Sequence, residues 1–480
     1  MNPYYRKSRK QTCLKSNNIG MNRREFMKST GISAAAMMAP ISLTSLMNHQ
    51  PPSKSGRPSG AVVGLGKRGK GMVLMQFPPY TDLLAICDVD QRRLDSTAQA
   101  FYEKFGRKID TYTDYRKLLE RKDIHFIANA TPEHWHTKIT IDACRAGKDV
   151  YLEKPMTLTI DEGKILRRVV KETNRIVQVG TQQRSGMQFQ IVSSMVRNGR
   201  LGKLKQVGVY LPVRDINNPP FCESAPVPEG LDWEFWLGQA PKKPYCEVKF
   251  NRPNAWWDYG GGIATNWGAH HIDIALWGIG ENYSGPELIE TDGYAPNRGT
   301  KGYPRHFRHF TSRLTYPDDV EMWCMTVNPD DKELSDKTKR VVSPYLNKVP
   351  ESIRDYNLTN KHSGVLFIGE KGRIFVGRNG AVGEEFPELD RIPLQENGSN
   401  RFWSYLYEHT NNFVRCMDSR QQPVCSVPIQ QITQLPCHLI NISLQLGRKL
   451  EWDSEKEEFI GDNEANGYLS REQREPYAFS

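Results

Sequence analysis

Residues 61–69 read Ala61-Val62-Val63-Gly64-Leu65-Gly66-Lys67-Arg68-Gly69, an apolar run followed by glycines in Gly-x-Gly-x-x-Gly spacing. The apolar run predicts a buried strand. The glycines predict a tight turn into a helix, where the backbone can come close to a pyrophosphate group. A second apolar run, Leu83 to Cys87, ends in Asp88, an acid placed to accept hydrogen bonds from ribose hydroxyl groups. This stretch therefore predicts a dinucleotide-binding domain.

Strand and helix patterns alternate over residues 60–181. The Thr159-Ile160-Asp161-Glu162 stretch is a capping box, which predicts the start of a helix. Alternation of this kind predicts a parallel, doubly wound sheet, that is, a Rossmann domain. The expected strands are 61–63, 83–87, 124–128, 150–152 and 176–179, and the expected helices are 91–105, one after Asp114, one ending near Gly147, and one opening at Thr159.

The pattern changes over residues 182–480, where long apolar strands flank short turns. Residues 307–315 and 320–327 flank one turn, and residues 365–368 and 373–376 flank another. Strands joined in this way predict an α/β domain with an open, mostly antiparallel sheet. A strand over 207–211 and helices over 400–418 and 429–446 complete it.

The basic charge of the chain is concentrated at its beginning. Residues 1–60 hold ten Lys and Arg against the single acid Glu25, so they account for nine of the ten net positive charges of the chain. The nearly neutral remainder offers no strongly basic surface for a nucleic acid backbone, which argues against nucleic acid as a partner.

The pair Arg23-Arg24 resembles a twin-arginine export motif, and a weakly apolar run follows from Ile32 to Leu46. That run contains Pro40 and several hydroxyl residues, so it is too short and polar for a permanent membrane span. We therefore expect a signal region at 1–47, a Pro/Ser/Gly linker at 48–59, and export to the periplasm through the twin-arginine translocon.

The nine cysteines are dispersed, with no Cys-x-x-Cys pair and no close Cys/His spacing. An odd, scattered set argues against a disulfide framework and against a zinc site. No metal ion is expected.

Further motifs resemble the Gfo/Idh/MocA family, named after glucose–fructose oxidoreductase and inositol dehydrogenase. Together with the glycine turn, the matching stretches are 130–136 (Ala-Thr-Pro-Glu-His-Trp-His), 146–150, Glu153-Lys154-Pro155 and the histidine segment 265–273. The resemblance implies a Rossmann domain and an open-sheet domain with the active site between them. It also implies a homo-oligomer, either a dimer or a tetramer.

The resemblance assigns most of the cofactor contacts. Lys154 would bridge the nicotinamide ribose and the substrate hydroxyl, with a cis peptide before Pro155. Thr131, Pro132 and His136 would line the nicotinamide, although a structural role for His136 is nearly as plausible. The full set expected at the cofactor is Gly64, Gly66, Lys67, Arg68, Gly69, Asp88, Arg92, Thr131, Pro132, His136, Glu153 and Lys154.

Asp88 favours NAD as the cofactor, because a carboxylate accepts hydrogen bonds from the adenosine ribose. Arg92 or Arg93 could instead accommodate a 2′-phosphate, so NADP stays open.

The resemblance places His270 at the position of the general base, where an imidazole can take a hydroxyl proton. The family pattern there is usually Asp-x-x-x-His, whereas this chain has Asn266. An amide can orient a neighbouring group, but it carries no charge that would stabilise an imidazolium. His271 could therefore act as the general base instead of His270.

Six of the ten tryptophans fall within residues 233–277. Aromatic rings stack on the apolar faces of sugars, which suggests Trp257 and Tyr259 as carbohydrate contacts. An aromatic core beneath a long insertion explains the same pattern equally well. Gln182 and Arg184, after the last expected Rossmann strand, are further candidate substrate ligands, together with Asn266 and His270.

These observations predict an exported oxidoreductase that transfers hydride between a carbinol of a sugar, polyol or glycoside and a tightly held nicotinamide cofactor. The first alternative is a redox-neutral, NAD-dependent glycosidase, which would oxidise, eliminate, hydrate and reduce the same glycoside. The second is a binding protein that keeps a cofactor without catalysis.

Overall fold

The computed structural model describes residues 56–212, 221–280, 285–295, 297–326, 340, 343–360, 363–391 and 398–479. The expected signal region and most of the expected linker lie outside these residues. Within them, no helix is long and apolar enough to cross a membrane.

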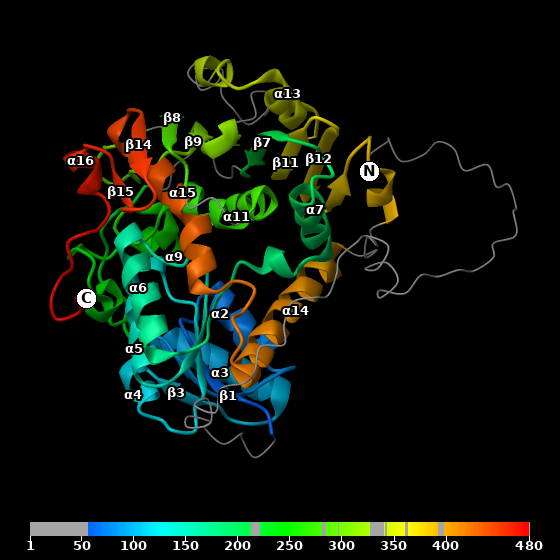
Figure 1. Cartoon of the computed structure of the whole chain (residues 1–480). Coiled ribbons are helices and arrows are strands. Elements are labelled where there is room, and N and C mark those ends of the chain that lie inside the picture. Colours follow the sequence, from blue (N-terminus) through cyan, green and yellow to red (C-terminus); the bar gives the residue numbers. More distant parts are fainter. Residues whose placement is uncertain are drawn as a thin grey trace, which may run out of the picture. The chain divides into compact units, whose positions relative to one another are not determined.

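The first domain is built on a parallel sheet, shown in blue and cyan in Figure 1. Six described strands follow the order β3-β2-β1-β4-β5-β6, and every neighbouring pair is parallel. This is the strand order of a Rossmann domain, as the sequence predicts. The strands are β1 (Ser59–Val63), β2 (Asp82–Cys87), β3 (Asp110–Tyr112), β4 (Phe126–Asn129), β5 (Asp149–Leu152) and β6 (Val177–Val179).

Helices cover both faces of this sheet, because its strands bury apolar side chains on both sides. The expected capping box is confirmed: the Thr159 hydroxyl accepts a hydrogen bond from the Glu162 amide at the start of α6. The helices are α2 (Lys67–Gly71), which continues into the π-helix η3 (Met72–Gln76), α3 (Gln91–Phe105), α4 (Tyr115–Leu119), α5 (Glu133–Arg145) and α6 (Ile160–Thr173).

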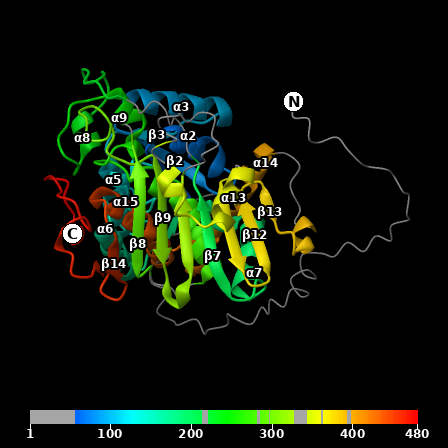
Figure 2. The ribbon, with the colours of Figure 1, turned by 90° about the horizontal axis from the view of Figure 1, so that it is seen from above.

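The second domain is built on a mixed sheet, seen face-on in Figure 2. Among the described residues nine strands follow the order β13-β12-β11-β7-β10-β9-β8-β14-β15. All neighbouring pairs are antiparallel except β7 and β10. The mostly antiparallel sheet expected from the sequence is confirmed. The strands are β7 (Leu204–Tyr210), β8 (Leu288–Tyr294), β9 (His309–Thr315), β10 (Glu321–Met325), β11 (Gly364–Gly369), β12 (Gly372–Gly377), β13 (Gly380–Val382), β14 (Leu450–Asp453) and β15 (Glu458–Phe459).

Helices α7 (Met187–Arg197), α11 (Gly268–Ile279) and α15 (Val427–Leu446) pack against one face of the second sheet. Helix α15 also contacts α6, and α14 (Gly398–Ser419) places Phe413 and Met417 on the first sheet. Segments from the second half of the chain therefore hold the two sheets together. The remaining elements of this half are η4 (Gln182–Ser185), η6 (Pro317–Asp319), α13 (Glu351–Asn360), η7 (Pro387–Arg391) and α16 (Asn463–Asn466).

Residues 221–266 form the aromatic insertion between β7 and α11. Trp233, Trp236, Trp256 and Tyr259 are buried in one cluster there. For these four rings the aromatic-core interpretation is the correct one. The insertion contains α8 (Trp233–Leu237), α9 (Glu247–Asn251), η5 (Pro253–Ala255) and α10 (Gly262–Asn266).

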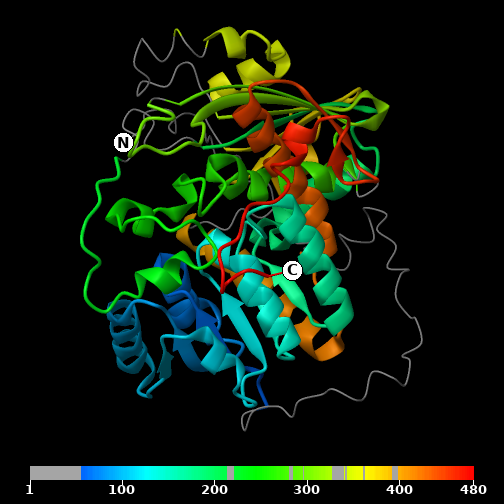
Figure 3. The same ribbon diagram turned by 90° about the vertical axis from the view of Figure 1, so that its left-hand side faces the viewer.

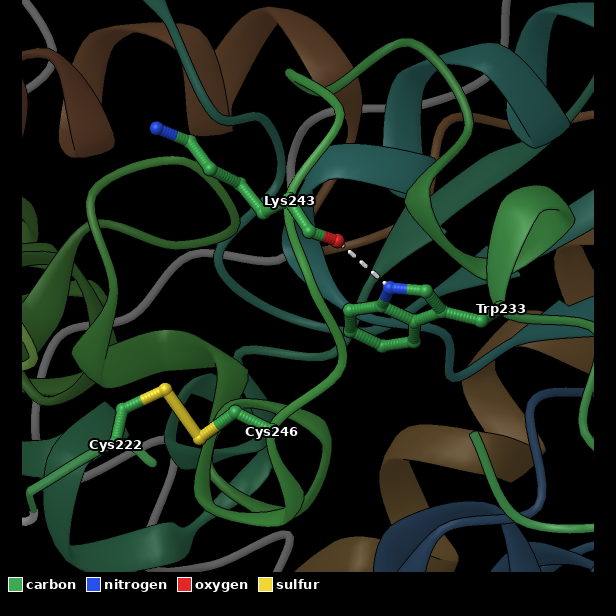
Figure 4. The surroundings of a disulfide bond; sticks show 4 residues. All are labelled: Cys222, Trp233, Lys243 and Cys246. Carbon is green, nitrogen blue, oxygen red and sulfur yellow. Dashed lines mark hydrogen bonds between the residues drawn. A yellow bond between two sulfur atoms is a disulfide. The ribbon is translucent and has the colours of Figure 1, made fainter. Parts of the chain in front are cut away.

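A disulfide joins Cys222 to Cys246 within the insertion (Figure 4). The Trp233 indole donates to the Lys243 carbonyl at 2.8 Å in the same loop. The bond corrects the expectation drawn from the scattered cysteines, because folding brings two Cα atoms 24 residues apart in sequence to 5.9 Å. Cysteine spacing alone does not reveal such a pair.

Candidate active site

The glycine turn predicted from the sequence follows β1. Gly64 has φ = +86°, and a Cβ atom there would lie 2.7 Å from the Thr131 amide nitrogen. At Gly69 a Cβ atom would lie only 1.7 Å from the Gly64 carbonyl oxygen, so helix α2 packs directly on the turn. At Gly66 the atom nearest to such a Cβ atom belongs to the Arg93 side chain and is 3.8 Å away. The backbone at Gly66 is thus open to a ligand, whereas Gly64 and Gly69 make the turn compact.

A cavity of about 350 Å³ opens beside this turn. Its inner side is lined by Gly64, Gly66, Lys67, Arg68, Asp88, Arg93, Thr131 and Pro132, among others. Its outer side is lined by the aromatic insertion, through Phe235, Trp236, Phe250, Asn251 and Pro253. An open glycine backbone, a carboxylate and aromatic walls suit the pyrophosphate, ribose and adenine of a dinucleotide. The residues present therefore fit a nicotinamide cofactor.

Asp88 lies at the end of β2 and lines the cavity. Its Oδ2 accepts from the Leu65 amide at 2.6 Å and its Oδ1 from the Asp90 amide at 2.9 Å. Burial raises the pKa of this carboxyl group, which these amide bonds oppose. Asp88 therefore fixes the glycine turn while presenting a carboxylate to the cavity.

The two arginines considered for a 2′-phosphate differ in position. Arg92 pairs with Asp90 at 2.7 Å, and Arg92 does not line the cavity. Arg93 lines the cavity and lies over the Phe250 ring, 4.0 Å from its centroid. Arg93, which the sequence offered only as an alternative, is the better placed of the two.

Lys154 follows β5, and the Lys154–Pro155 peptide is cis, as the resemblance implies. Its Nζ donates to the side-chain oxygen of Asn266 and, at 3.2 Å, to the Asn266 backbone carbonyl. An ammonium group has three donors, so one remains for a substrate hydroxyl if these two bonds persist. Burial lowers the pKa of Lys154, which the Glu153 and Glu133 carboxylates oppose.

His270 and His271 lie in the first turn of α11, against the Trp267 ring. Burial lowers the pKa of both, and so does the charge of Arg378. Lys154 is a further cause only for His270. The Nδ1 atom of His270 has no hydrogen-bond partner among the described residues. The lowered pKa favours the neutral imidazole of His270. His271 is fully enclosed and lies 3.5 Å from the Gln183 amide nitrogen.

The loop that follows β4 is held from behind by His136. Its Nδ1 lies 2.6 Å from the Pro155 carbonyl and its Nε2 lies 2.9 Å from the Thr131 carbonyl. His136 thus connects the Thr131–Pro132 loop to the segment that carries Lys154, a structural role that the sequence left open.

Glu153 organises the base of the site. Its Oε1 accepts from Arg68 Nε at 2.7 Å and from Gln182 Nε2 at 3.2 Å. Gln182 also donates to the Tyr151 hydroxyl at 3.1 Å. Arg68, which is partly buried, and Gln182, which is buried, therefore belong to one hydrogen-bond network centred on the residue before Lys154.

Three residues expected to bind the substrate instead contact other side chains of the protein. Arg184 Nε donates to both carboxylate oxygens of Asp273, at 3.0 and 2.9 Å, and both side chains are buried. Tyr259 is fully buried against His134 and Trp236, so its ring does not face the cavity. Trp257 is half-buried beneath Arg471, whose guanidinium lies 4.4 Å from the ring centroid.

Glu133 belongs to the 130–136 motif, but the sequence did not indicate its role in the site. Its Oε2 accepts from the Gly261 amide at 2.8 Å, which fixes the glycine loop before α10 and hence Asn266. Burial raises the pKa of Glu133, and the charges of Lys154 and Arg471 oppose this. Its position next to Pro132, in the loop expected at the nicotinamide, was the available signal. Within the described residues no cluster of three or more potential metal ligands occurs.

Both domains match family models. Residues 59–181 match the NAD-binding Rossmann fold of the Gfo/Idh/MocA oxidoreductase family, and residues 220–334 match the C-terminal α/β domain of that family.

Similar curated proteins include a glycosyl hydrolase family 109 protein of Shewanella pealeana, 30% identical over 202 residues, and an alpha-N-acetylgalactosaminidase of Shewanella oneidensis, 29% identical over 204 residues. Each match covers 38% of this chain and 44% of the relative, so less than half of each relative is spanned.

Solved structures share the fold. The WlbA dehydrogenase of Bordetella pertussis, in complex with NADH and UDP-GlcNAcA, superposes with a TM-score of 0.59 at 17% identity, covering 83% of this chain and 98% of that one. The aldose-aldose oxidoreductase of Caulobacter crescentus gives 0.55 at 15% identity, covering 82% and 99%. With two successive domain matches and a shared two-domain fold, this chain belongs to the Gfo/Idh/MocA oxidoreductase family.

Proposed function

We propose that this protein is an NAD-dependent oxidoreductase that transfers hydride between a carbinol carbon of a carbohydrate and its cofactor. The observation that carries the proposal is the contact of Lys154 with Asn266, which brings an ammonium from the Rossmann domain beside the helix that bears His270. The aromatic cavity beside the glycine turn supports the binding of a dinucleotide, and its lining reaches Thr131 and Pro132 of the loop after β4.

The bound nicotinamide would supply the hydride acceptor. Lys154 donates a hydrogen bond to the substrate hydroxyl and stabilises the negative charge that develops on its oxygen. Neutral His270 takes the hydroxyl proton on a ring nitrogen. Loss of that proton and of one hydride, which carries two electrons, converts the carbinol to a carbonyl. Asn266 keeps the ammonium in place without adding a charge of its own.

We also propose that the protein works outside the cytoplasm with a cofactor that it does not exchange. The Arg23-Arg24 motif supports export. The Cys222–Cys246 disulfide supports it too, because such bonds persist mainly in oxidising compartments. Such a compartment offers no recycling pool for a free cofactor, so the substrate itself would regenerate it. Passage through the translocon and a dimeric or tetrameric state stay predictions.

A redox-neutral glycosidase is the second candidate, and the names of the curated relatives favour it. In this scheme a transient ketone at C3 acidifies the proton on C2. Elimination then releases the aglycone, water adds to the double bond, and the hydride returns to C3. Lys154 and His270 would serve the oxidation and reduction steps in the same way.

The test begins with protein recovered after export, which is denatured so that the supernatant can be assayed for NAD and NADP. One equivalent of either supports a captive cofactor. Native protein is then given pairs of sugars and chromogenic glycosides. Exchange of oxidation state between two sugars indicates the oxidoreductase, and aglycone release without net NADH indicates the glycosidase. Protein that is empty and binds no added dinucleotide would sink both.

A further inference from the structure

The outer wall of the cofactor cavity comes from outside the Rossmann domain. Phe235 and Trp236 belong to α8, and Phe250 belongs to α9. They share the cavity with Asp88 and Arg93, which mark its adenosine end. Adenine is a flat aromatic group that packs well against such rings. A ligand at this end therefore lies between the Rossmann turn and the insertion.

The back of this wall is held by a C-terminal segment, residues 471–479, which Figure 3 shows in red running beside the Rossmann helices. Arg474 contacts α8 and the residues just after it through both its side chain and its backbone. Its guanidinium pairs with the Glu234 carboxylate and donates to the carbonyls of Gly238 at 2.6 Å and Ala240 at 3.2 Å. Its backbone amide donates to the Gln239 carbonyl at 3.0 Å.

Tyr477 of the same segment touches two residues that line the cavity, one on α8 and one on α5. Its ring stacks on Phe235, with centroids 5.8 Å apart and planes 25° apart. It meets the Trp135 ring edge-on, also at 5.8 Å. Both Phe235 and Trp135 line the cavity. Tyr477 therefore supports the cavity wall from the side away from the ligand.

The disulfide secures the other end of the insertion. Cys246 is the residue immediately before α9, which carries Phe250, and its partner is Cys222 (Figure 4). The wall is thus anchored at α8 by the C-terminal segment, and a covalent bond ties the start of α9 to the beginning of the insertion.

We propose that residues 233–253 form an adenosine-binding wall and that Arg474 and Tyr477 hold it closed, so that the bound dinucleotide leaves slowly. The inference rests on the proposed function only in taking a nicotinamide dinucleotide as the ligand. Release of the adenosine half requires α8 to move away from the Rossmann turn. That motion breaks the Arg474 contacts and exposes the Tyr477 ring. Arg474 and Tyr477 are positioning residues, since they touch the wall and not the cofactor.

The experiment compares the full-length protein with its Arg474→Ala and Tyr477→Ala variants. Each is loaded with NADH, and the dissociation rate is measured from the loss of NADH fluorescence when excess NAD is added. Both variants should release NADH at least tenfold faster. The same variants should bind adenosine 5′-monophosphate more weakly. Their binding of nicotinamide mononucleotide should not change, because only the adenosine end loses its wall.

Arg448→Ala is the matched control, since Arg448 also pairs with acidic residues, Asp462 and Glu464, in the C-terminal half of the chain but does not touch the wall. Glu234→Gln weakens the ion pair with Arg474 but leaves the sequence of the C-terminal segment unaltered. It should also make NADH dissociate faster, and this effect cannot come from misfolding of an altered C-terminal segment. Unchanged release in Arg474→Ala, Tyr477→Ala and Glu234→Gln overturns the inference alone. Failure of the unaltered protein to bind NADH overturns the proposed function together with it.

Discussion

The two ends of the candidate cofactor site are built from different interactions. At the reaction end, Lys154 makes two polar contacts with Asn266, which lies two residues before the helix that carries His270. At the adenosine end, Phe235 and Trp236 supply an aromatic wall supported from behind by Arg474 and Tyr477. The first arrangement positions the Lys154 ammonium, and the second encloses the apolar surface of the bound ligand. Changes at the reaction end should therefore alter rates, whereas changes at the adenosine end should alter retention.

Replacement of Lys154 by alanine should give the largest effect. It removes the donor that stabilises charge on the substrate oxygen, so turnover should fall by about 10²–10³-fold. Retention of NADH should change little, because the adenosine wall is untouched. The measurement is kcat on an accepted sugar or glycoside, together with the NADH dissociation rate.

Lys164→Ala is a suitable comparison for that change, because Lys164 is a partly buried lysine on α6 that pairs with Asp161. It should keep normal turnover. If Lys154→Ala also kept normal turnover, the reaction end would have been assigned to the wrong residues, and a purely binding role would gain support.

Gly69→Ala should act at the junction of the two ends. The new Cβ atom would lie 1.7 Å from the Gly64 carbonyl, so the turn and α2 must separate. Overpacking of this kind costs about 1–3 kcal/mol. We expect a loss of at least tenfold in NADH affinity by titration, with a lower unfolding temperature.

Gly71→Ala is the control for the turn, since no atom lies within 4 Å of a Cβ atom at Gly71 and its φ is −64°. Alanine there should leave affinity unchanged. Equal losses in the two variants would mean that the helix, and not the close packing of the turn, determines affinity.

The sequence predicts the Rossmann side of the site better than the aromatic wall opposite it, for a physical reason. The glycine turn, Asp88 and the Thr159 cap depend on spacing within a few residues or within one βαβ unit, and the structure contains each of them. Lys154 and His270 were identified through the resemblance of their motifs to those of the family.

The adenosine wall depends on contacts between distant segments, which no local pattern encodes. Arg474 and Glu234 are 240 residues apart in sequence. The tryptophan cluster signalled an unusual insertion, but the pattern did not distinguish a sugar surface from a core. Tyr259 proved to be core because its ring is enclosed by His134 and Trp236.

Asn266→Asp should change the pH dependence of turnover more than it changes the maximal turnover rate. A carboxylate beside Lys154 Nζ favours the ammonium, so the pKa of Lys154 should rise, and the alkaline limit of activity should move upward by about one pH unit. The pKa of neighbouring His270 should also rise, which moves the acid limit upward. The measurement is a profile of kcat/KM against pH.

Asn198→Asp, at an exposed position after α7, is the control for that change and should leave both limits in place. A variant profile that moved downward would show that the new carboxylate does not face Lys154.

His306→Gln, in the loop before β9, should give the smallest effect. His306 Nε2 contacts the Gly260 carbonyl at 2.8 Å, and burial lowers the pKa of His306 to about 3. The unfolded chain, with an ordinary pKa near 6.5, therefore binds one more proton than the folded chain between about pH 6.5 and 3. The free energy of unfolding falls as pH falls through this window, by about 1.4 kcal/mol per pH unit for one such group. The variant lacks this group, so urea unfolding between pH 7 and pH 5 should show a loss of stability about 2 kcal/mol smaller than in the unaltered protein. Parallel losses would mean that folding does not lower the pKa of His306.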